Sequence, residues 1–167
     1  MKNMLMIWLG LAVWAWGVEN LEVSADKFEH LEKEKRAIFQ GNAHATQGKS
    51  RIDARKFVVY FDEKGEAREY QALGKVRFEI IRPGRHIKGH CDRLIYKVAA
   101  DTYRLSGHTY LQDLINHRTM SGKEIFLDNK KGRATAVSDR KGPVKFVFPM
   151  KDARGKGAKS GKKKEKR

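Results

Sequence analysis

The run Gly89-His90-Cys91-Asp92 places an imidazole, a thiol and a carboxylate next to one another. These are the side-chain types that bind zinc or assist a nucleophile. Adjacent residues of a β-strand point to opposite faces, so these side chains would not converge. No second group of such residues stands at the spacing that zinc sites use. We therefore expect no metal site here, and expect Cys91 to be a small buried apolar residue.

The sequence contains no recognisable catalytic motif. Its six histidines are scattered, and no nucleophile, base and acid can be grouped by motif. It contains neither a phosphate-binding P-loop nor a His-Glu-x-x-His motif. We predict that the protein is not an enzyme and needs no cofactor, and that its function resides on an extended surface.

Three glycines, Gly41, Gly74 and Gly107, are spaced 33 residues apart, and each is the centre of the same alternating pattern. Around Gly74, for example, apolar or small residues occupy every second position from Tyr70 to Ile80, and the skipped positions are mostly polar. A period of two places the two sets on opposite faces of a strand. The constant spacing indicates that one structural unit is repeated.

The position of these glycines predicts how the strands are shaped. A glycine inside a strand lowers stability unless it permits a bulge, a bend or a close approach of the backbone. Three glycines at one register indicate strands that all bend at the same level. We predict an all-β fold, a single folded-over antiparallel sheet or β-jellyroll with a continuous apolar face, built from repeats of about 33 residues.

Turn signals separate the predicted strands. Asp62-Glu63-Lys64-Gly65 and Arg82-Pro83-Gly84-Arg85 are examples, because Asp accepts hydrogen bonds from the backbone and Gly adopts positive φ. Leu21-x-Val23 and Phe28 to Leu31 are predicted to form two short strands at the start, and Val144-x-Phe146-x-Phe148 a last one. No long segment has a convincing helical stripe.

The first 17 residues predict export. Lys2 supplies a positive charge, the run from Met4 to Ala15 is apolar, and Ala15 and Gly17 are the small residues that a signal peptidase reads. We expect residues 1–17 to be a signal peptide that is cleaved before Val18. The alternative is an uncleaved membrane anchor, although the apolar run is shorter than the about 20 residues of a membrane span.

The chain carries a net charge of +16, which predicts an acidic partner such as phosphate, nucleic acid or anionic lipid. Residues 151–167 hold nine Lys and Arg against Asp152 and Glu165, and the rest of the chain is also basic. This last segment has no large apolar side chain, so we expect a disordered Lys-rich tail. Residues 18–150 are then predicted to form one domain.

The run from Ala37 to Lys56 resembles the signature of the OstA-like (LptA) family, in which a glycine-centred strand leads to Gln-Gly and then to an Ile-x-Ala-Asp segment. The corresponding residues here are Gly41, Gln47-Gly48 and Ile52-Asp53-Ala54. Arg55 departs from the pattern, because it stands where a second acidic residue is usual. Val23-Ser24-Ala25-Asp26 is similar to the family's opening strand, and the resemblance extends from Leu21 to Phe148.

The resemblance implies a periplasmic protein of the lipopolysaccharide transport bridge of Gram-negative bacteria, important for outer-membrane assembly. It implies an apolar trough that shields the acyl chains of lipid A, since each buried CH₂ contributes about 0.8 kcal/mol. A basic rim would hold lipid phosphates. Open edge strands would pair head to tail with further copies, with an inner-membrane LptC-like component and with an outer-membrane LptD-like component.

Strand alternation selects the side chains that would line such a trough and bind lipid. They are Phe39, Ala43, Ala72, Val76, Phe78, Ile80, Leu105, Leu111, Phe146 and Phe148. From Phe57 to Phe61 both faces are apolar, so alternation leaves open whether Phe57, Val59 and Phe61 or Val58 and Tyr60 point inward. The same residues could also build a closed core, and the sequence does not separate the two cases.

Two other functions remain open at this point. The first is a membrane-anchored LptC-like component of the same pathway, which would keep the apolar N-terminal segment. The second is a nucleic-acid-binding β module that uses the positive charge and the aromatic residues, although we do not expect an exported protein to have a nucleic-acid partner.

Overall fold

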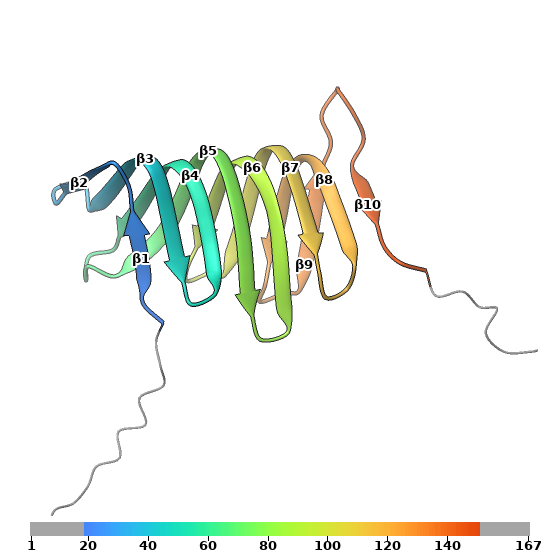
Figure 1. Ribbon diagram of the computed structural model, residues 1–167, viewed down its shortest axis with the longest axis horizontal. Helices are drawn as coiled ribbons and strands as arrows, with labels where there is room; N and C mark the ends of the chain where they lie inside the picture. The colour runs from blue at the N-terminus through green and yellow to red at the C-terminus, as the bar shows by residue number, and fades with distance from the viewer. Residues whose placement is uncertain (1–18, 151–167) are drawn as a thin grey trace, which may run out of the picture.

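The computed structural model describes residues 19–150, and these residues form ten β-strands and no helix (Figure 1). The strands are β1 (Leu21–Ser24), β2 (Lys27–Leu31), β3 (Arg36–Gln47), β4 (Ser50–Phe61), β5 (Ala67–Arg82), β6 (Arg85–Lys97), β7 (Thr102–Asp113), β8 (Arg118–Asp128), β9 (Arg133–Val137) and β10 (Lys145–Val147). The predicted all-β class is confirmed. The expected signal peptide and the expected basic tail lie outside the described residues. Within residues 19–150, no helix is long and apolar enough to cross a membrane.

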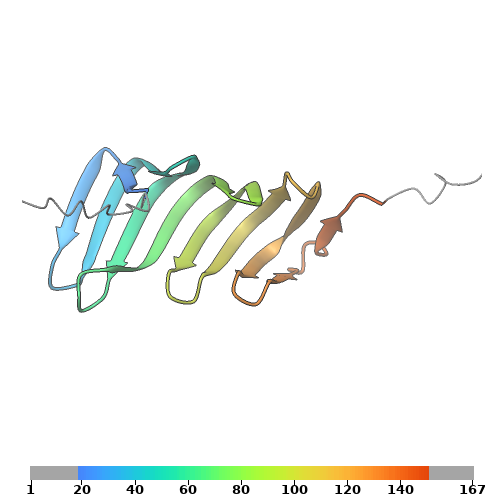
Figure 2. The ribbon, with the colours of Figure 1, turned by 90° about the horizontal axis from the view of Figure 1, so that it is seen from below.

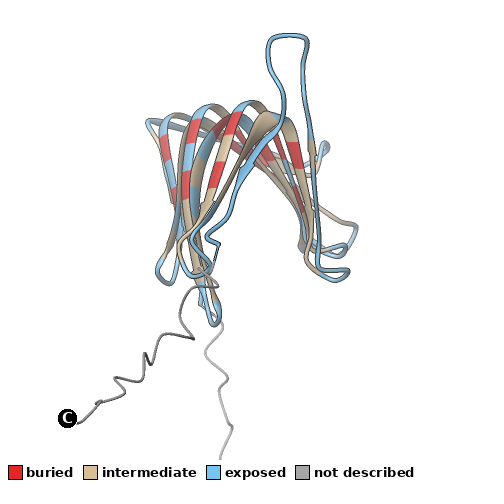
Figure 3. Ribbon diagram, turned by 90° about the vertical axis from the view of Figure 1, so that its right-hand side faces the viewer, coloured by how far each residue is buried: buried red, intermediate tan, exposed pale blue. Residues whose placement is uncertain are grey.

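All ten strands belong to one antiparallel sheet, in which β3 to β8 follow one another as hairpins. Figure 2 shows that the strands succeed one another in chain order along the long axis of the molecule. Each of these six strands bends near its middle, so the sheet doubles over along one line, which we call the fold line. Seen along the row of strands, the two halves of the sheet diverge from this line like the arms of a V (Figure 3).

We call the two halves of the sheet the first wall and the second wall. The first wall consists of β2, β9 and residues 36–40, 57–61, 67–73, 93–97, 102–106 and 124–128. The second wall consists of β1, β10 and residues 43–47, 50–54, 76–82, 85–91, 109–113 and 118–122. The sheet is open, because no strand pairing in the described residues joins the walls at their far ends.

Each edge of the sheet consists of two short strands, one in each wall. At one edge, β1 and β2 both pair with β3, on opposite sides of its bend. At the other edge, β9 and β10 both pair with β8 in the same way. The two predicted initial strands are confirmed. The predicted last strand is shorter than expected, at residues Lys145–Val147, and β9 was not predicted from the sequence.

The three repeated glycines produce the bend, as predicted. Gly41, Gly74 and Gly107 have φ values of 83°, 79° and 75°. The residue after each glycine also has a positive φ, and the register of the strand pairs shifts at the same level. Glycine adopts this conformation without the steric cost that a Cβ atom brings. Two consecutive left-handed residues therefore turn each strand while its neighbours remain paired on either side.

The intervening strands bend differently, and this settles the alternatives left open for residues 57–61. In β4 the inner face carries Ile52 and Ala54 before the bend, and Phe57 and Val59 after it, so the alternation changes phase at the bend. Val58 is also buried, but it lies on the outer face beside its register partner Ile38. At the bend β4 has one residue fewer than β3 and β5 between the same paired positions. The alternation of β4 therefore shifts by one residue, which is why a strict period of two could not choose between the two sets.

Carboxylates cover two of the three bends. The Asp26 side chain packs over Gly41 and accepts a hydrogen bond from Asn42 Nδ2 at 2.9 Å. The Asp92 side chain packs over Gly107 in the same manner, and its Oδ2 lies 2.8 Å from His108 Nδ1. At the middle bend the stem of Arg55 covers Gly74 instead. A Cβ atom at any of these glycines would therefore collide with a side chain as well as strain the backbone.

The most deeply buried side chains lie along the fold line, where the walls are closest. They are Ala43, Ala72, Val76, Leu94, Leu105 and Ile125, each at most 1% exposed. Alanines on the first strands of the row let the walls approach each other there, because a small side chain leaves room for the facing residue. The core is therefore a narrow band that follows the fold line through the whole row of strands.

Replacing Gly107 with alanine should lower the free energy of unfolding by about 3 kcal/mol, from backbone strain and from overpacking. The added Cβ would stand 2.8 Å from the Cβ of Asp92. Gly65 is a matched control, because its φ is 81° and nothing lies within 4 Å of the added atom. Gly65→Ala should cost only the backbone term, about 1 kcal/mol. Urea unfolding of the two variants measures the difference, and equal losses would show that the contact at the bend is unimportant.

Candidate functional site

The inner face between the two walls is the main apolar surface of the molecule. It contains the buried cluster along the fold line and a second layer of half-buried side chains further out, among them Phe61, Ile80, Ile87 and Leu127. A small cavity of about 20 Å³ lies between the walls in this second layer. That volume holds about one water molecule. We call the space between the walls, from the fold line to the open side, the trough.

A row of aromatic rings follows the first wall inside the trough, and we call it the aromatic ladder. Successive ring centroids lie 4.9, 6.5, 6.1, 6.2 and 4.3 Å apart. The six rings, one from each of the strands β2 to β7, are Phe28, Phe39, Phe57, Tyr70, Tyr96 and Tyr103. Rings at these separations attract one another beyond the effect of burial. The ladder therefore gives the trough a continuous apolar lining from one edge strand to the far half of the sheet.

The ladder changes from phenylalanine to tyrosine along the chain, and the tyrosine hydroxyl groups bring polar atoms into the trough. Burial raises the pKa of Tyr70, and it raises the pKa of Tyr103 to about 12. Tyr96 Oη donates a hydrogen bond of 3.2 Å to Asp101 Oδ1. Burial, followed by the negative charge of Asp101, raises the pKa of Tyr96 as well. All three phenols are neutral at physiological pH, because apolar surroundings disfavour the charged phenolate.

A polar contact crosses the open side of the trough. Arg85, at the start of β6 in the second wall, donates a hydrogen bond from Nη1 to Asn129 Oδ1, which follows β8 in the first wall. Asn129 Nδ2 in turn donates to Asp101 Oδ1 at 2.9 Å. The two walls are thus linked at their outer ends by side chains, whereas at the fold line they are joined by the continuous chain of each bent strand.

Eight of the ten predicted lining residues lie together on the inner face. Ala43, Ala72, Val76, Phe78, Leu105 and Leu111 are buried in the central cluster, and Phe39 and Ile80 are half-buried against it. Phe146 and Phe148 lie apart, at the β10 edge, where they are 48% and 55% exposed and their ring centroids are 5.6 Å from each other. Lipid binding by all ten residues stays a prediction. The half-buried residues are the more accessible ones, because those on the fold line are covered by the facing wall.

Sequence reasoning missed most of the aromatic ladder. Tyr70 and Tyr103 start the inward alternation around Gly74 and Gly107, 33 residues apart, but they were not among the predicted lining residues. Tyr96 and Phe57 lie on strands where the alternation changes phase, so their direction could not be read from the period. Phe28 stands on β2, whose pairing with β3 brings its ring beside Phe39. Neighbours in different strands depend on register, which one sequence does not specify.

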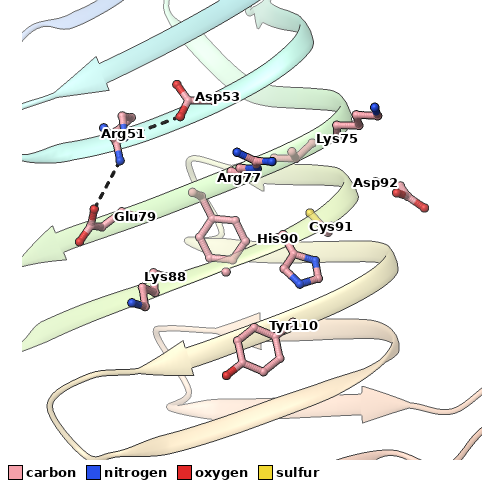
Figure 4. A pocket seen from close by; sticks show the side chains of 13 residues that line it. Arg51, Asp53, Lys75, Arg77, Glu79, Lys88, His90, Cys91, Asp92 and Tyr110 are labelled. Atoms are coloured by element: carbon pink, nitrogen blue, oxygen red, sulfur yellow. Dashed lines mark ion pairs between the residues drawn. The ribbon is translucent and has the colours of Figure 1, made fainter.

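The outer face of the second wall has a different character. It carries a shallow hollow of about 770 Å³ over β4, β5, β6 and β7, whose rim is formed mainly by charged side chains and whose lining also includes Val76, Phe78 and Tyr110 (Figure 4). Arg51 forms ion pairs with Asp53 at 3.6 Å and Glu79 at 3.8 Å. Arg77 and Lys88 are exposed beside them. Ion pairs at such solvated positions contribute little to stability. The outer face is therefore a hydrated surface, in contrast to the trough.

The structure also places the residues of the run Gly89-His90-Cys91-Asp92. His90 is exposed and stacks on Tyr110 with the ring centroids 5.6 Å apart, whereas Cys91 is buried in the central cluster. Burial raises the pKa of the Cys91 thiol to about 12, so the thiol is protonated at neutral pH. The two side chains belong to opposite faces, as predicted. Across residues 19–150, no three His, Cys, Asp or Glu side chains are grouped so that they could hold a metal ion.

Known proteins resemble this chain in sequence and in fold. The chain is 27% identical over 142 residues to the lipopolysaccharide export system protein LptA of Escherichia coli K12, covering 77% of this chain and 76% of that protein. The LptA of Shigella flexneri matches with the same values. The crystal structure of LptH from Pseudomonas aeruginosa, described as the LptA homologous periplasmic component of a lipopolysaccharide transport device, superposes with a TM-score of 0.67. That match has 18% identity and covers 79% of this chain and 96% of LptH, so it supports the fold.

The family model described as LptA/(LptD N-terminal domain) LPS transport protein matches residues 22–133. The matched segment starts in β1 and ends at the beginning of β9, so it includes all six bent strands and most of both walls. The resemblance inferred from the glycine-centred repeats is confirmed, and the chain belongs to the LptA/(LptD N-terminal domain) family of lipopolysaccharide transport proteins.

Proposed function

We propose that this protein is a periplasmic carrier of lipopolysaccharide, without catalytic activity, that shields the acyl chains of the lipid in the trough. On this proposal it contributes to a bridge between the inner and outer membranes and so to outer-membrane assembly. The observation that carries the proposal is the continuous apolar lining of the trough, from β2 to β8, in a sheet that is open on its far side. The periplasmic location printed for LptH supports the proposed compartment.

Acyl chains need such a surface in an aqueous compartment. Each CH₂ group removed from water contributes about 0.8 kcal/mol, so a lipid with several chains cannot cross water unshielded. The aromatic ladder and the half-buried aliphatic side chains supply the complementary surface. The row of strands is continuous, so the lipid could move along the trough without leaving it.

Lipid entry requires the walls to move apart. The cavity of about 20 Å³ is far too small for an acyl chain. All strand-to-strand hydrogen bonds run along the sheet, so parting the walls breaks side-chain contacts such as Arg85–Asn129 but no strand pairing. The acyl chains would then replace the contacts that the two inner faces lose. We therefore propose a trough that is nearly closed when empty and is opened by its lipid.

The two edges of the sheet are proposed as the surfaces that join copies of the protein and its LptC-like and LptD-like partners. Large apolar side chains are exposed at both edges. They are Leu21 and Phe28 at the first edge, and Val137, Val144, Phe146, Val147 and Phe148 at or near the second. An unpaired edge that also exposes apolar side chains normally promotes association. Strand pairing between copies would join one trough to the next.

A photo-crosslinking amino acid at Ile80 should react with lipopolysaccharide, whereas the same group at Ile81 should not. The two residues are a matched pair, because both are half-buried isoleucines of β5 and only Ile80 packs against the inner cluster. Ile80 is preferable to Phe78, which is only 5% exposed. The measurement is ultraviolet crosslinking of full-length protein with purified lipopolysaccharide, followed by immunoblotting. Reaction at both positions, or at Ile81 alone, would contradict a lipid site between the walls.

Lysine in place of Phe28 or Phe146 should weaken self-association about tenfold, because each change puts a charge into an apolar edge. Phe28 is 60% exposed on β2, and Phe146 is on β10 at the opposite edge. Ile115→Lys is the control, since Ile115 is comparably exposed but lies in the turn between β7 and β8. Sedimentation equilibrium over a range of concentrations measures the association. An equal effect of all three substitutions would argue against pairing through the edges.

A further inference from the structure

Two arginines face into the trough near its open side. Arg82 ends β5 and Arg85 begins β6, and each continues the inward alternation of its strand, next to Ile80 and Ile87 respectively. Both line the small cavity between the walls. All other side chains that line this cavity in the described structure are aliphatic or aromatic. Two positive charges beside an otherwise apolar cavity, on the exposed Arg82 and the half-buried Arg85, call for a physical reason.

The two charges lack a carboxylate partner in the described part of the chain. No Asp or Glu oxygen of residues 19–150 is recorded within ion-pair distance of either guanidinium group. Arg85 donates to the neutral amide of Asn129. The carboxylate of Asp101 is engaged by Asn129 and Tyr96, with both hydrogen bonds ending on Oδ1. Asp101 is thus linked to Arg85 only through Asn129, and it forms no direct ion pair with either arginine.

Arg82 and Arg85 are also direct cross-strand partners, on either side of the Pro83-Gly84 turn. Like charges in directly opposite positions of an antiparallel pair destabilise the sheet. A guanidinium group is planar, stays charged, and binds phosphate through two parallel hydrogen bonds. A pair of them at one point provides a site for a group with at least one phosphate.

We propose that Arg82 and Arg85 bind the phosphate groups of a lipid whose acyl chains enter the trough, an inference that rests on the lipid-carrier function proposed above. The ligand is an amphiphile with phosphate at its head, as in lipid A. Apolar side chains and the aromatic ladder hold its chains, and the arginine pair fixes the position of its head. Within the charged outer hollow, by contrast, Arg51 is already paired with Asp53 and Glu79.

The dimensions of the second wall agree with this assignment. The β5–β6 hairpin extends further from the fold line than the other hairpins do (Figure 1). From Val76 at the fold line to Arg82 the strand spans about 20 Å, at about 3.3 Å per residue. One leaflet of a bilayer core is about 15 Å thick. Acyl chains directed toward the fold line therefore fit below the arginine pair, and the phosphates reach it from the open side.

The contact between Arg85 and Asn129 gives the site a second role. A phosphate is charged and accepts stronger hydrogen bonds than a neutral amide does. Binding of a phosphate would draw Arg85 away from Asn129, and the side-chain link between the walls would be released. Head-group binding and opening of the trough would thus be coupled at one residue.

The test compares full-length wild-type protein with the double variant Arg82→Gln/Arg85→Gln. The control variant Arg77→Gln/Lys88→Gln removes the same charge from the same two strands on the outer face. Asn129→Ala removes the link between the walls and keeps both arginines. The probes are diphosphorylated lipid A and the same lipid after enzymatic removal of its phosphates. Affinity is measured by displacement of a fluorescent lipid, and folding by circular dichroism.

The double variant should bind phosphorylated lipid A at least about tenfold more weakly than wild type, with unchanged affinity for the dephosphorylated lipid. The control variant and Asn129→Ala should bind phosphorylated lipid A no more weakly than wild type. An equal loss for both lipids, or no loss, would overturn the arginine site while leaving the carrier function intact. Failure of wild type to bind either lipid would overturn the carrier function and the arginine site together.

A last experiment distinguishes two possible ligands of the arginine pair, a lipid phosphate and free inorganic phosphate. Inorganic phosphate at millimolar concentration should displace lipid A from wild type only weakly, because it gains nothing from the apolar trough. Binding of inorganic phosphate as tight as that of phosphorylated lipid A would identify a free anion as the ligand and overturn the lipid assignment.

Discussion

The structure depends on one geometric constraint, which is that six adjacent strands must bend at the same level without losing their pairing. A bend in one strand alone would break its hydrogen bonds to both neighbours. The solution combines two left-handed residues in β3, β5 and β7, which have one extra residue at each bend, with a change of phase in the alternation of β4, β6 and β8. Because the six strands bend at the same level, the fold line continues through all of them and the strands stay paired within each wall.

The bend also decides which side chains meet. It places the inner faces of the walls opposite each other, so residues that would be surface residues in a flat sheet become a core near the fold line. Further out the walls diverge, and the same apolar alternation leaves half-buried residues such as Ile80 and Leu127. One sequence pattern thus yields a stabilising core and an accessible apolar surface, and distance from the fold line alone separates the two.

The sequence predicts this fold well because the residues that make the bend recur at a constant spacing. The spacing of Gly41, Gly74 and Gly107 identified the bend, and alternation around them identified the inner face. What could not be predicted depends on register between strands. The phase change in β4, the joining of Phe28 and Tyr103 into one aromatic ladder, and the contact of Arg85 with Asn129 all arise from residues brought together by pairing or by folding over. β9 was not predicted because the strand has only five residues and most of them are exposed.

The division of each edge strand limits what can add to the sheet. β1 and β2 are separated at Asp26, and they present two short segments at an angle, one on each wall. A straight strand from an unrelated protein can follow only one of these segments before it diverges from the other. A chain that bends at the same level can follow both. The shape of the edge therefore favours pairing with sheets that bend in the same way. It disfavours pairing with flat strands, on which amyloid-like growth depends.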